Sequence, residues 1–272
     1  MQYTIFMGLK SYLLIFFVLF YLTVVLLMYF AQRSFLYFPN EDNYITNETI
    51  NFNYETININ STNKIALKSW YCSDNPSKKF ILFLHGNAGT LKSRIYKLNA
   101  FNDLDLNFLA ITWRGFSGNS GHPSENGLYE DALSAVNWLN SNGIKNEDII
   151  IYGESLGTAI AIEISQKSNY AGVILESPFT SISSMGKLKF PYLPIDLILN
   201  DKFDSINKTS NINIPSLVLH GKDDNLVPFY MGQEIFASLT YKSKSHFVDD
   251  DHMMRFDDQM IEAISRFVKY LD

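Results

Sequence analysis

Short apolar runs that alternate with helix-like segments constrain the fold of this chain most strongly. From residue 80 onward, continuous apolar runs such as FILFL and DIIIYG are each followed by a longer segment rich in helix-forming residues. Strands that alternate with helices build βαβ units, in which a mostly parallel sheet is covered by helices on both faces. The sequence therefore predicts the α/β class with a doubly wound, mostly parallel sheet.

The residues before 80 follow a different pattern. In residues 49–59 and 64–72, apolar side chains occupy every second position, which is typical of antiparallel strands with one face in water. The alternation after residue 80 leaves no room for a second domain, and its one irregular stretch is residues 177–213. We expect a single domain over residues 44–272, with residues 177–213 inserted as a small cap.

The N-terminal segment is predicted to anchor the chain in a membrane. Residues 11–31 carry no charge, and about 21 apolar residues are enough to cross a bilayer as a helix. A cleaved signal peptide fits less well, because the apolar region is too long and Tyr29 stands where a small residue should precede the cleavage site. We therefore predict an N-terminal segment over residues 1–31 with an uncleaved single-pass anchor at 11–31, and a juxtamembrane connector at 32–43. Lys10 and Arg33 flank the anchor on opposite sides, so the charges favour neither orientation.

Composition and spacing exclude several kinds of partner and cofactor. The net charge of −6 argues against a nucleic-acid partner, which would require a basic surface. Cys72 is the only cysteine, so the chain can form neither an intrachain disulfide nor a cysteine-based metal site. The three adjacent aspartates at 249–251 lack the spaced ligands of a calcium loop. We therefore predict no metal and no cofactor.

The sequence GESLG places Ser155 between a short β-branched run and a helix-like segment. Gly153 and Gly157 have no Cβ atom, so they allow a sharp turn and a close approach of the helix to the strand. A strained strand–turn–helix connection of this kind lifts the serine oxygen clear of the backbone and forms a nucleophile elbow. Ser155 is therefore the candidate nucleophile.

A serine nucleophile requires a base and an orienting acid, and in a doubly wound sheet such groups lie at the carboxyl ends of strands. Asp223 and Asp224 both follow the strand that ends in LHG. We predict Asp224 as the acid, with a turn aspartate or a helix-capping aspartate as the alternative. His252 follows the final strand, whereas His246 lies within it, so His252 is the predicted base. The resulting order of serine, aspartate and histidine is the one that this architecture uses.

Two glycine-rich loops follow other strands of the predicted sheet. In LHGNAGT, at residues 84–90, a strand-to-helix turn presents free backbone N–H groups. The N–H groups of Asn87 and Leu156 are candidate donors to a developing oxyanion, with an ordinary glycine turn as the alternative reading of the loop. In WRGFSGNSG, we expect Arg114 to be buried and to hold the loop in place, with substrate binding as the alternative.

Four motifs, LHGNAG, WRGFSGNSGHPSENGLYEDA, YGESLGT and HGKDDNLVP, together resemble the membrane-anchored α/β-hydrolase family with an HGNAG oxyanion loop. The similarity extends from QRSFLYFP to the C-terminus, and eukaryotic members include depalmitoylating and lipid-handling serine hydrolases. The resemblance implies the α/β-hydrolase fold, with Ser155 as nucleophile, Asp224 as acid, His252 as base, and Asn87 and Leu156 in the oxyanion hole. The chain departs from the family pattern beside His252, where aspartates precede the histidine and methionines follow it.

These observations predict a serine hydrolase that cleaves acyl esters or thioesters, such as an esterase, a lipase or an acyl-protein thioesterase. Its substrate would be a small acyl ester or a lipidated protein. The insertion at 177–213 gathers apolar residues that Pro191 and Pro194 interrupt, which favours a cap that binds an acyl chain over an ordinary crossover helix. A non-catalytic membrane-tethered binding module of the same fold is the alternative function.

Overall fold

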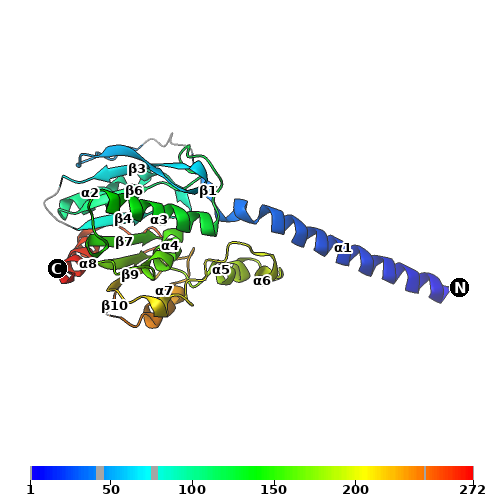
Figure 1. Cartoon of the computed structure of the whole chain (residues 1–272). Helices are drawn as coiled ribbons and strands as arrows, with labels where there is room; N and C mark the ends of the chain where they lie inside the picture. Colours follow the sequence, from blue (N-terminus) through cyan, green and yellow to red (C-terminus); the bar gives the residue numbers. More distant parts are fainter. Residues whose placement is uncertain (1, 41–45, 75–78, 242, 272) are drawn as a thin grey trace.

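The computed structural model describes residues 2–40, 46–74, 79–241 and 243–271, and an eight-stranded sheet forms its centre (Figure 1). The strand order is β10-β9-β8-β7-β4-β6-β3-β2. The strands are β2 (Glu55–Asn60), β3 (Ala66–Cys72), β4 (Phe80–Leu84), β6 (Asn107–Ile111), β7 (Ile149–Glu154), β8 (Gly172–Glu176), β9 (Ser216–Gly221) and β10 (Ser243–Val248). Strands β4 and β6 to β10 pair in parallel, whereas β3 pairs antiparallel with β2 and β6. The predicted mostly parallel sheet is confirmed, and so is the antiparallel pair before residue 80, although the first strand begins at Glu55 and residues 49–54 are not in a strand.

Helices cover both faces of this sheet. One apolar core includes residues of α3 (Glu125–Ser141), α4 (Leu156–Ser165) and α7 (Phe229–Ser238), and the other includes residues of α2 (Ile95–Asp103) and α8 (Asp258–Tyr270). Along β4, Leu82 and Leu84 belong to the first core, while Ile81 and Phe83 belong to the second. Both faces of the strand are therefore buried, which explains its uninterrupted apolar sequence. Short 3₁₀ turns occur at Thr62–Lys64, Leu91–Arg94, Asn146–Asp148 and Thr209–Asn211.

Helix α1 (Gln2–Leu36) extends away from the globular part of the chain (Figure 1). Its segment Lys10–Leu36 is 27 residues long and contains an 18-residue window with a mean hydropathy of 2.8, so it is long and apolar enough to cross a membrane. The helix includes the first residues of the predicted connector and is followed by β1 (Phe38–Pro39), which pairs in parallel with β5 (Ala88–Gly89). Residues 41–43 of the predicted connector and the predicted domain start at 44 lie outside the described residues.

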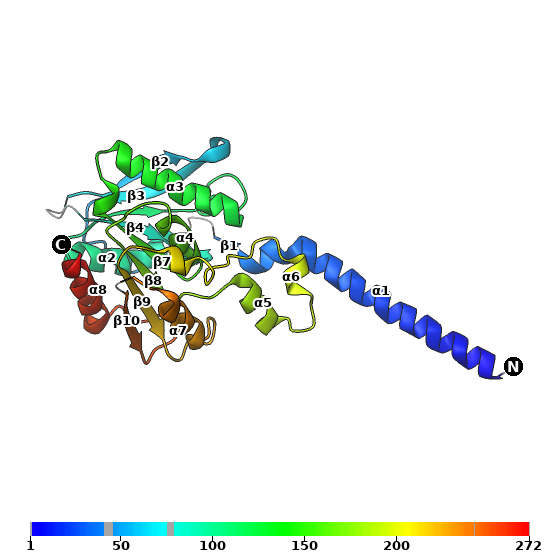
Figure 2. The ribbon, with the colours of Figure 1, turned by 60° about the horizontal axis from the view of Figure 1, so that its bottom comes forward.

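The insertion at residues 177–213 lies beside the C-terminal end of α1 (Figure 2). It contains the two short helices α5 (Ile182–Lys189) and α6 (Ile195–Ile198). Pro191 and Pro194 lie between them, and a proline cannot donate the backbone hydrogen bond that a continuous helix needs. The insertion, called the cap below, therefore consists of two short helices, one 3₁₀ turn and irregular chain rather than one regular crossover helix.

A buried arginine holds the loop that follows β6. Arg114 donates from Nε to Asp131 Oδ1 over 3.0 Å, and from one terminal nitrogen to the same oxygen over 2.7 Å. It also donates to the hydroxyl of Thr62 over 3.1 Å, so it links this loop to α3 and to the turn after β2. The expectation that Arg114 is a buried structural residue is confirmed.

Candidate active site

Ser155 lies on the sharp turn between β7 and α4. Its φ of 50° is in the left-handed region that a serine rarely adopts, and its backbone N–H donates to the carbonyl of Glu176 over 2.8 Å. A Cβ atom on Gly157 would lie 2.0 Å from the carbonyl oxygen of Leu84, and one on Gly153 would lie 2.5 Å from the carbonyl oxygen of Gly157. Only glycine fits these two positions, so the predicted strand–turn–helix context of Ser155 is confirmed.

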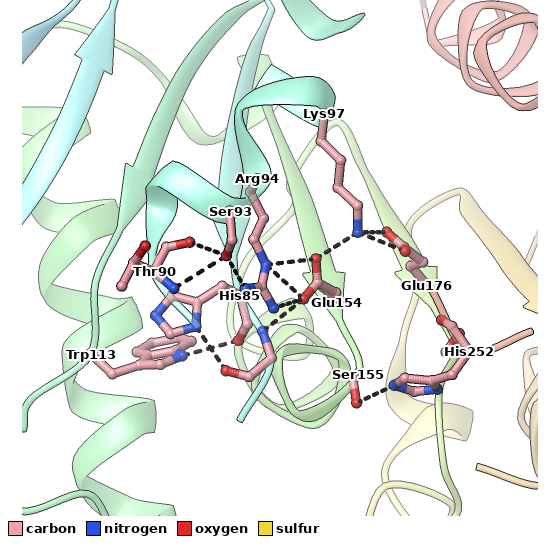
Figure 3. Close-up of polar contacts among 12 residues, drawn as sticks. His85, Thr90, Ser93, Arg94, Lys97, Trp113, Glu154, Ser155, Glu176 and His252 are labelled. Atoms are coloured by element: carbon pink, nitrogen blue, oxygen red, sulfur yellow. Dashed lines mark hydrogen bonds and ion pairs between the residues drawn. The ribbon is translucent and has the colours of Figure 1, made fainter. Parts of the chain in front are cut away.

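The structure brings the three predicted catalytic side chains together. The hydroxyl of Ser155 lies 3.1 Å from Nε2 of His252, a contact that Figure 3 shows. The other ring nitrogen of His252, Nδ1, lies 2.7 Å from Oδ2 of Asp224. The three residues come from the ends of β7, β9 and β10, which are separated in sequence but meet at one edge of the sheet.

The carboxylate of Asp224 is fully buried and saturated with hydrogen-bond donors. Its Oδ1 accepts from the backbone N–H groups of Leu226 (2.9 Å) and Val227 (2.7 Å). Asp224 therefore also stabilises the turn after β9, which was the alternative role predicted for it. Burial tends to raise the pKa of Asp224, but hydrogen bonds from His220 and His252 outweigh burial and hold this pKa well below its usual value. Asp224 therefore faces His252 as a carboxylate across the neutral pH range.

The two competing residues lie elsewhere. Asp223 is exposed, and its backbone N–H donates to the carbonyl of Asp250 over 3.0 Å. His246 lies inside β10 beside Leu219 of β9, and it lines a different cavity together with residues of α8. Burial lowers the pKa of His246, which favours its neutral form. Neither residue contacts Ser155.

The two predicted oxyanion donors belong to residues that line one cavity with Ser155. Leu156 is the first residue of α4, directly after Ser155. Asn87 is held by the end of α1, because its side-chain amide donates to the carbonyl of Leu36 over 2.9 Å. Its own carbonyl accepts from the N–H of Phe38 over 2.9 Å. The LHGNAGT loop is thus attached to the chain that leaves the N-terminal helix.

The cavity above Ser155 has a volume of about 710 Å³ and is lined mostly by apolar side chains. Its floor is Ser155 and Leu156, and its walls come from the cap, from the last turns of α1 and from the loop after β9. Lys189 is the only charged side chain among the described residues that line it. The lining residues of the cap are Phe179, Ile182, Met185, Gly186, Leu188, Lys189, Phe190, Ile195, Ile198 and Leu199.

A buried ionic network lies directly behind Ser155 (Figure 3). The ammonium of Lys97 is fully buried and lies 2.5 Å from Glu154 and 2.7 Å from Glu176. Arg94 binds Glu154 over 2.6 Å, and the hydroxyl of Tyr152 donates to Glu176 over 2.6 Å. Burial opposes ionisation of Glu154, yet the attraction of Lys97 and Arg94 holds its pKa well below the usual value.

This network joins the ends of β7 and β8 to α2 and holds the backbone on either side of the nucleophile turn. Sequence reasoning missed it, although two signals were present. Glu154 stands inside the GESLG motif and Glu176 ends the next apolar run, and both positions should be uncharged unless a cation neutralises them. The basic residues Arg94 and Lys97, three apart at the start of α2, are those cations.

Comparisons with known proteins agree with this architecture. Residues 75–200 match the family model described as serine aminopeptidase, S33. Protein bem46 of Schizosaccharomyces pombe is 32% identical over 216 residues, which are 74% of this chain and 72% of that protein. The lysophosphatidylserine lipase ABHD12 of Danio rerio is 34% identical over 197 residues, which are 65% of this chain and 51% of that protein. Among solved structures, the esterase Pf2001 of Pyrococcus furiosus superposes with a TM-score of 0.72 at 22% identity, covering 86% of this chain and 98% of that one.

Proposed function

Because the chain belongs to the α/β-hydrolase family and has the fold of that family, we propose that it is a membrane-anchored serine hydrolase of acyl esters or thioesters. Family membership supports hydrolase activity, and the catalytic residues and the substrate class are our own proposal. The observation that carries the proposal is the chain of contacts from Ser155 through His252 to Asp224, at 3.1 and 2.7 Å, on the floor of an apolar cavity.

The geometry supports acyl transfer in two steps. His252 takes the proton of Ser155 as the hydroxyl oxygen attacks the substrate carbonyl, and then gives that proton to the departing alcohol or thiol. Asp224 holds the imidazole by Nδ1 and stabilises its positive charge. Water then attacks the acyl-enzyme as His252 takes one of its protons, and His252 returns that proton to the oxygen of Ser155 as the bond to the acyl group breaks and the acid leaves. The backbone N–H groups of Asn87 and Leu156 would stabilise the oxyanion in both steps, and removing such a donor costs about 100- to 1,000-fold in rate.

The cavity favours an apolar acyl group over a peptide. Ligand pockets are mostly apolar with a few placed polar groups, and this one has a nucleophile at its floor and aliphatic or aromatic side chains in the cap. An aminopeptidase substrate has a free ammonium group, for which the described lining residues offer no carboxylate. The names of two similar proteins, a lysophosphatidylserine lipase and an esterase, agree with an acyl ester as substrate.

Membrane anchoring is the second part of the proposal. The segment Lys10–Leu36 is apolar and longer than the roughly 20 residues that a bilayer requires. Its side chains from Tyr12 to Leu22 are large apolar groups that are exposed in the structure. Burial in lipid would remove this surface from water. We propose a single-pass protein in which residues 1–31 carry the anchor and the domain follows on one side of the membrane.

Labelling with a fluorophosphonate probe tests the proposal and separates it from a non-catalytic binding module. The full chain in detergent or vesicles should react with the probe and hydrolyse p-nitrophenyl butyrate. Ser155→Ala should abolish both activities with an unchanged melting temperature, while Ser184→Ala, a cap serine that does not line the cavity, should react like the wild type. A wild-type chain that neither reacts nor hydrolyses would support the binding module, and labelling that persists in Ser155→Ala would identify another nucleophile.

A further inference from the structure

The last turns of α1 are attached to the cap by side-chain hydrogen bonds. Gln32 donates from Nε2 to the carbonyl of Ile198 over 2.9 Å, and its Oε1 accepts from the N–H of Asn200 over 2.7 Å. One residue further along, Arg33 donates to Asp201 over 2.9 Å. These contacts fix the orientation of the helix relative to the cap, so the anchor is no flexible tether.

The same helix turns form a wall of the cavity above Ser155. Met28, Gln32, Phe35 and Leu36 line the cavity opposite the cap residues. The ring of Phe35 also packs edge-on against the ring of Phe190 in the cap, with the two ring centres 6.1 Å apart. A substrate that fills this cavity would therefore contact the last turns of the anchor helix.

Contacts between α1 and the cap also show how far the cap reaches along the anchor. The hydroxyl of Tyr21 donates to the carbonyl of Tyr192 in the cap over 2.9 Å. At about 1.5 Å per residue, Tyr21 lies about 15 Å from Ala31, the end of the uncharged stretch. If residues 11–31 fill the hydrocarbon layer of about 30 Å, the Tyr192 contact lies near the middle of that layer. If residues 2–20 fill it instead, with about 28 Å of helix, the contact lies at its boundary.

The part of the cap that lies beside the anchor exposes large apolar side chains next to an ion pair between Lys187 and Asp196, at 2.6 Å. We define the cap tip as Leu188, Tyr192 and Leu197, whose exposed fractions are 56%, 88% and 85%. Figure 2 shows α5 and α6, which carry or flank these residues, beside α1. Lys187 and Lys189 stand on either side of Leu188, and lysines can keep their charged ends in water while their stems lie on apolar surface. Tyrosine next to lysine is typical of a membrane interface.

We propose that the cap tip is embedded in the same leaflet as the end of α1, and that the substrate is a membrane-resident acyl lipid or lipidated chain that enters the cavity laterally along α1. The chemistry at Ser155 rests on the function proposed above, whereas the position of the cap tip does not. A lipid that stays partly in the leaflet keeps its acyl chain out of water on the way to the cavity, which lowers the cost of extraction for every CH₂ group that stays buried. The anchor would then act both as a tether and as one side of the entrance.

The first test compares two substrates for the full chain in phosphatidylcholine vesicles. One is water-soluble p-nitrophenyl butyrate, and the other is 4-methylumbelliferyl palmitate dissolved in the bilayer. The double variant Tyr192→Asp/Leu197→Asp changes exposed residues that do not line the cavity. It should lose at least tenfold in palmitate hydrolysis and stay within twofold on butyrate. Tyr270→Asp, on an exposed residue of the C-terminal helix, is the matched control and should leave both rates unchanged.

Equal effects of the double variant on both substrates, or no effect on either, would overturn lateral entry while leaving the hydrolase function intact. A wild-type chain that hydrolyses neither substrate would instead refute the proposed function, so the position of the cap tip needs a readout without activity. Leu197→Cys and Tyr270→Cys can be labelled with an environment-sensitive nitrobenzoxadiazole dye, since the native Cys72 is buried and the wild type should stay unlabelled. The dye at 197 should be quenched by lipids that carry a nitroxide on the acyl chain, and the dye at 270 should be quenched by iodide in water. Quenching of the 197 dye by iodide alone would overturn the proposal.

Discussion

Replacing Asp224 by asparagine should stop turnover by changing the tautomer of His252. The carboxylate makes two kinds of contact: Oδ1 accepts from the N–H groups of Leu226 and Val227, and Oδ2 faces Nδ1 of His252. Asparagine has nearly the same shape, but one of its two ends is a donor. If the amide nitrogen replaced Oδ1, it would oppose two backbone N–H donors in a buried place. The amide oxygen must therefore stay there, and the NH₂ group must face His252.

An NH₂ group facing Nδ1 makes that nitrogen an acceptor, so the single proton of the neutral imidazole moves to Nε2. In this tautomer, Nε2 donates to the hydroxyl of Ser155 and cannot take its proton. Loss of the correct tautomer in a serine triad typically lowers kcat by about 10⁴-fold, or about 5 kcal/mol of transition-state stabilisation. We expect a loss of that size in Asp224→Asn with little change in KM.

The assay measures kcat and KM for p-nitrophenyl butyrate with the full chain, together with the melting temperature and the rate of fluorophosphonate labelling. Asp223→Asn is the matched control, because Asp223 is the adjacent aspartate and is exposed. It should retain kcat within about threefold of the wild type, which is a smaller loss than the tenfold change that corresponds to about 1.4 kcal/mol. If Asp224→Asn kept more than a tenth of the wild-type kcat, or if both variants lost equally, the assignment of the orienting acid would be refuted.

Three further predictions follow from the site and its surroundings. His252→Ala should lose hydrolysis by several orders of magnitude while His246→Ala keeps most of it, and the opposite ranking in the same esterase assay would overturn the choice of base. Lys97→Met should cost about 3–5 kcal/mol in free energy of unfolding, because it leaves buried carboxylates without their cation, whereas the exposed Lys145→Met should change it by less than about 1 kcal/mol. Because the pKa of Glu154 is lowered in the folded chain, its ion pairs stabilise the fold fully above the usual carboxylate pKa, and this stabilisation is lost as the pH falls through the pKa of the folded state. The difference in free energy of unfolding between wild type and Lys97→Met, measured in urea, should therefore become smaller below about pH 4. Finally, kcat/KM for p-nitrophenyl esters should rise from acetyl to octanoyl as each CH₂ enters the cavity, at about 0.8 kcal/mol per group, and a flat profile would rule out the acyl pocket.

Local sequence patterns were enough to predict most of the sheet and its helices. The run at Phe80–Leu84 is apolar without interruption because both of its faces are buried, whereas the strands before residue 80 alternate because one face is in water. The proximity of the candidate catalytic residues could also be predicted, since the carboxyl ends of parallel strands meet at one edge of a sheet wherever those strands lie in the sequence. Ser155, Asp224 and His252 could therefore be placed together from their positions after strands alone.

The contacts that depend on tertiary structure could not be predicted from local sequence patterns. Lys97 binds Glu154 and Glu176, which are 57 and 79 residues away, and no periodic pattern links a charge on one helix to a carboxylate at the end of a distant strand. The same holds for the end of α1. Residues 32–36 looked like a short connector, but Gln32 and Arg33 bind the cap and extend the helix into the wall of the cavity. Periodicity reports which face of an element is buried, whereas the partner of a buried polar group is chosen only when the folded chain brings that group to a donor or acceptor that can replace water.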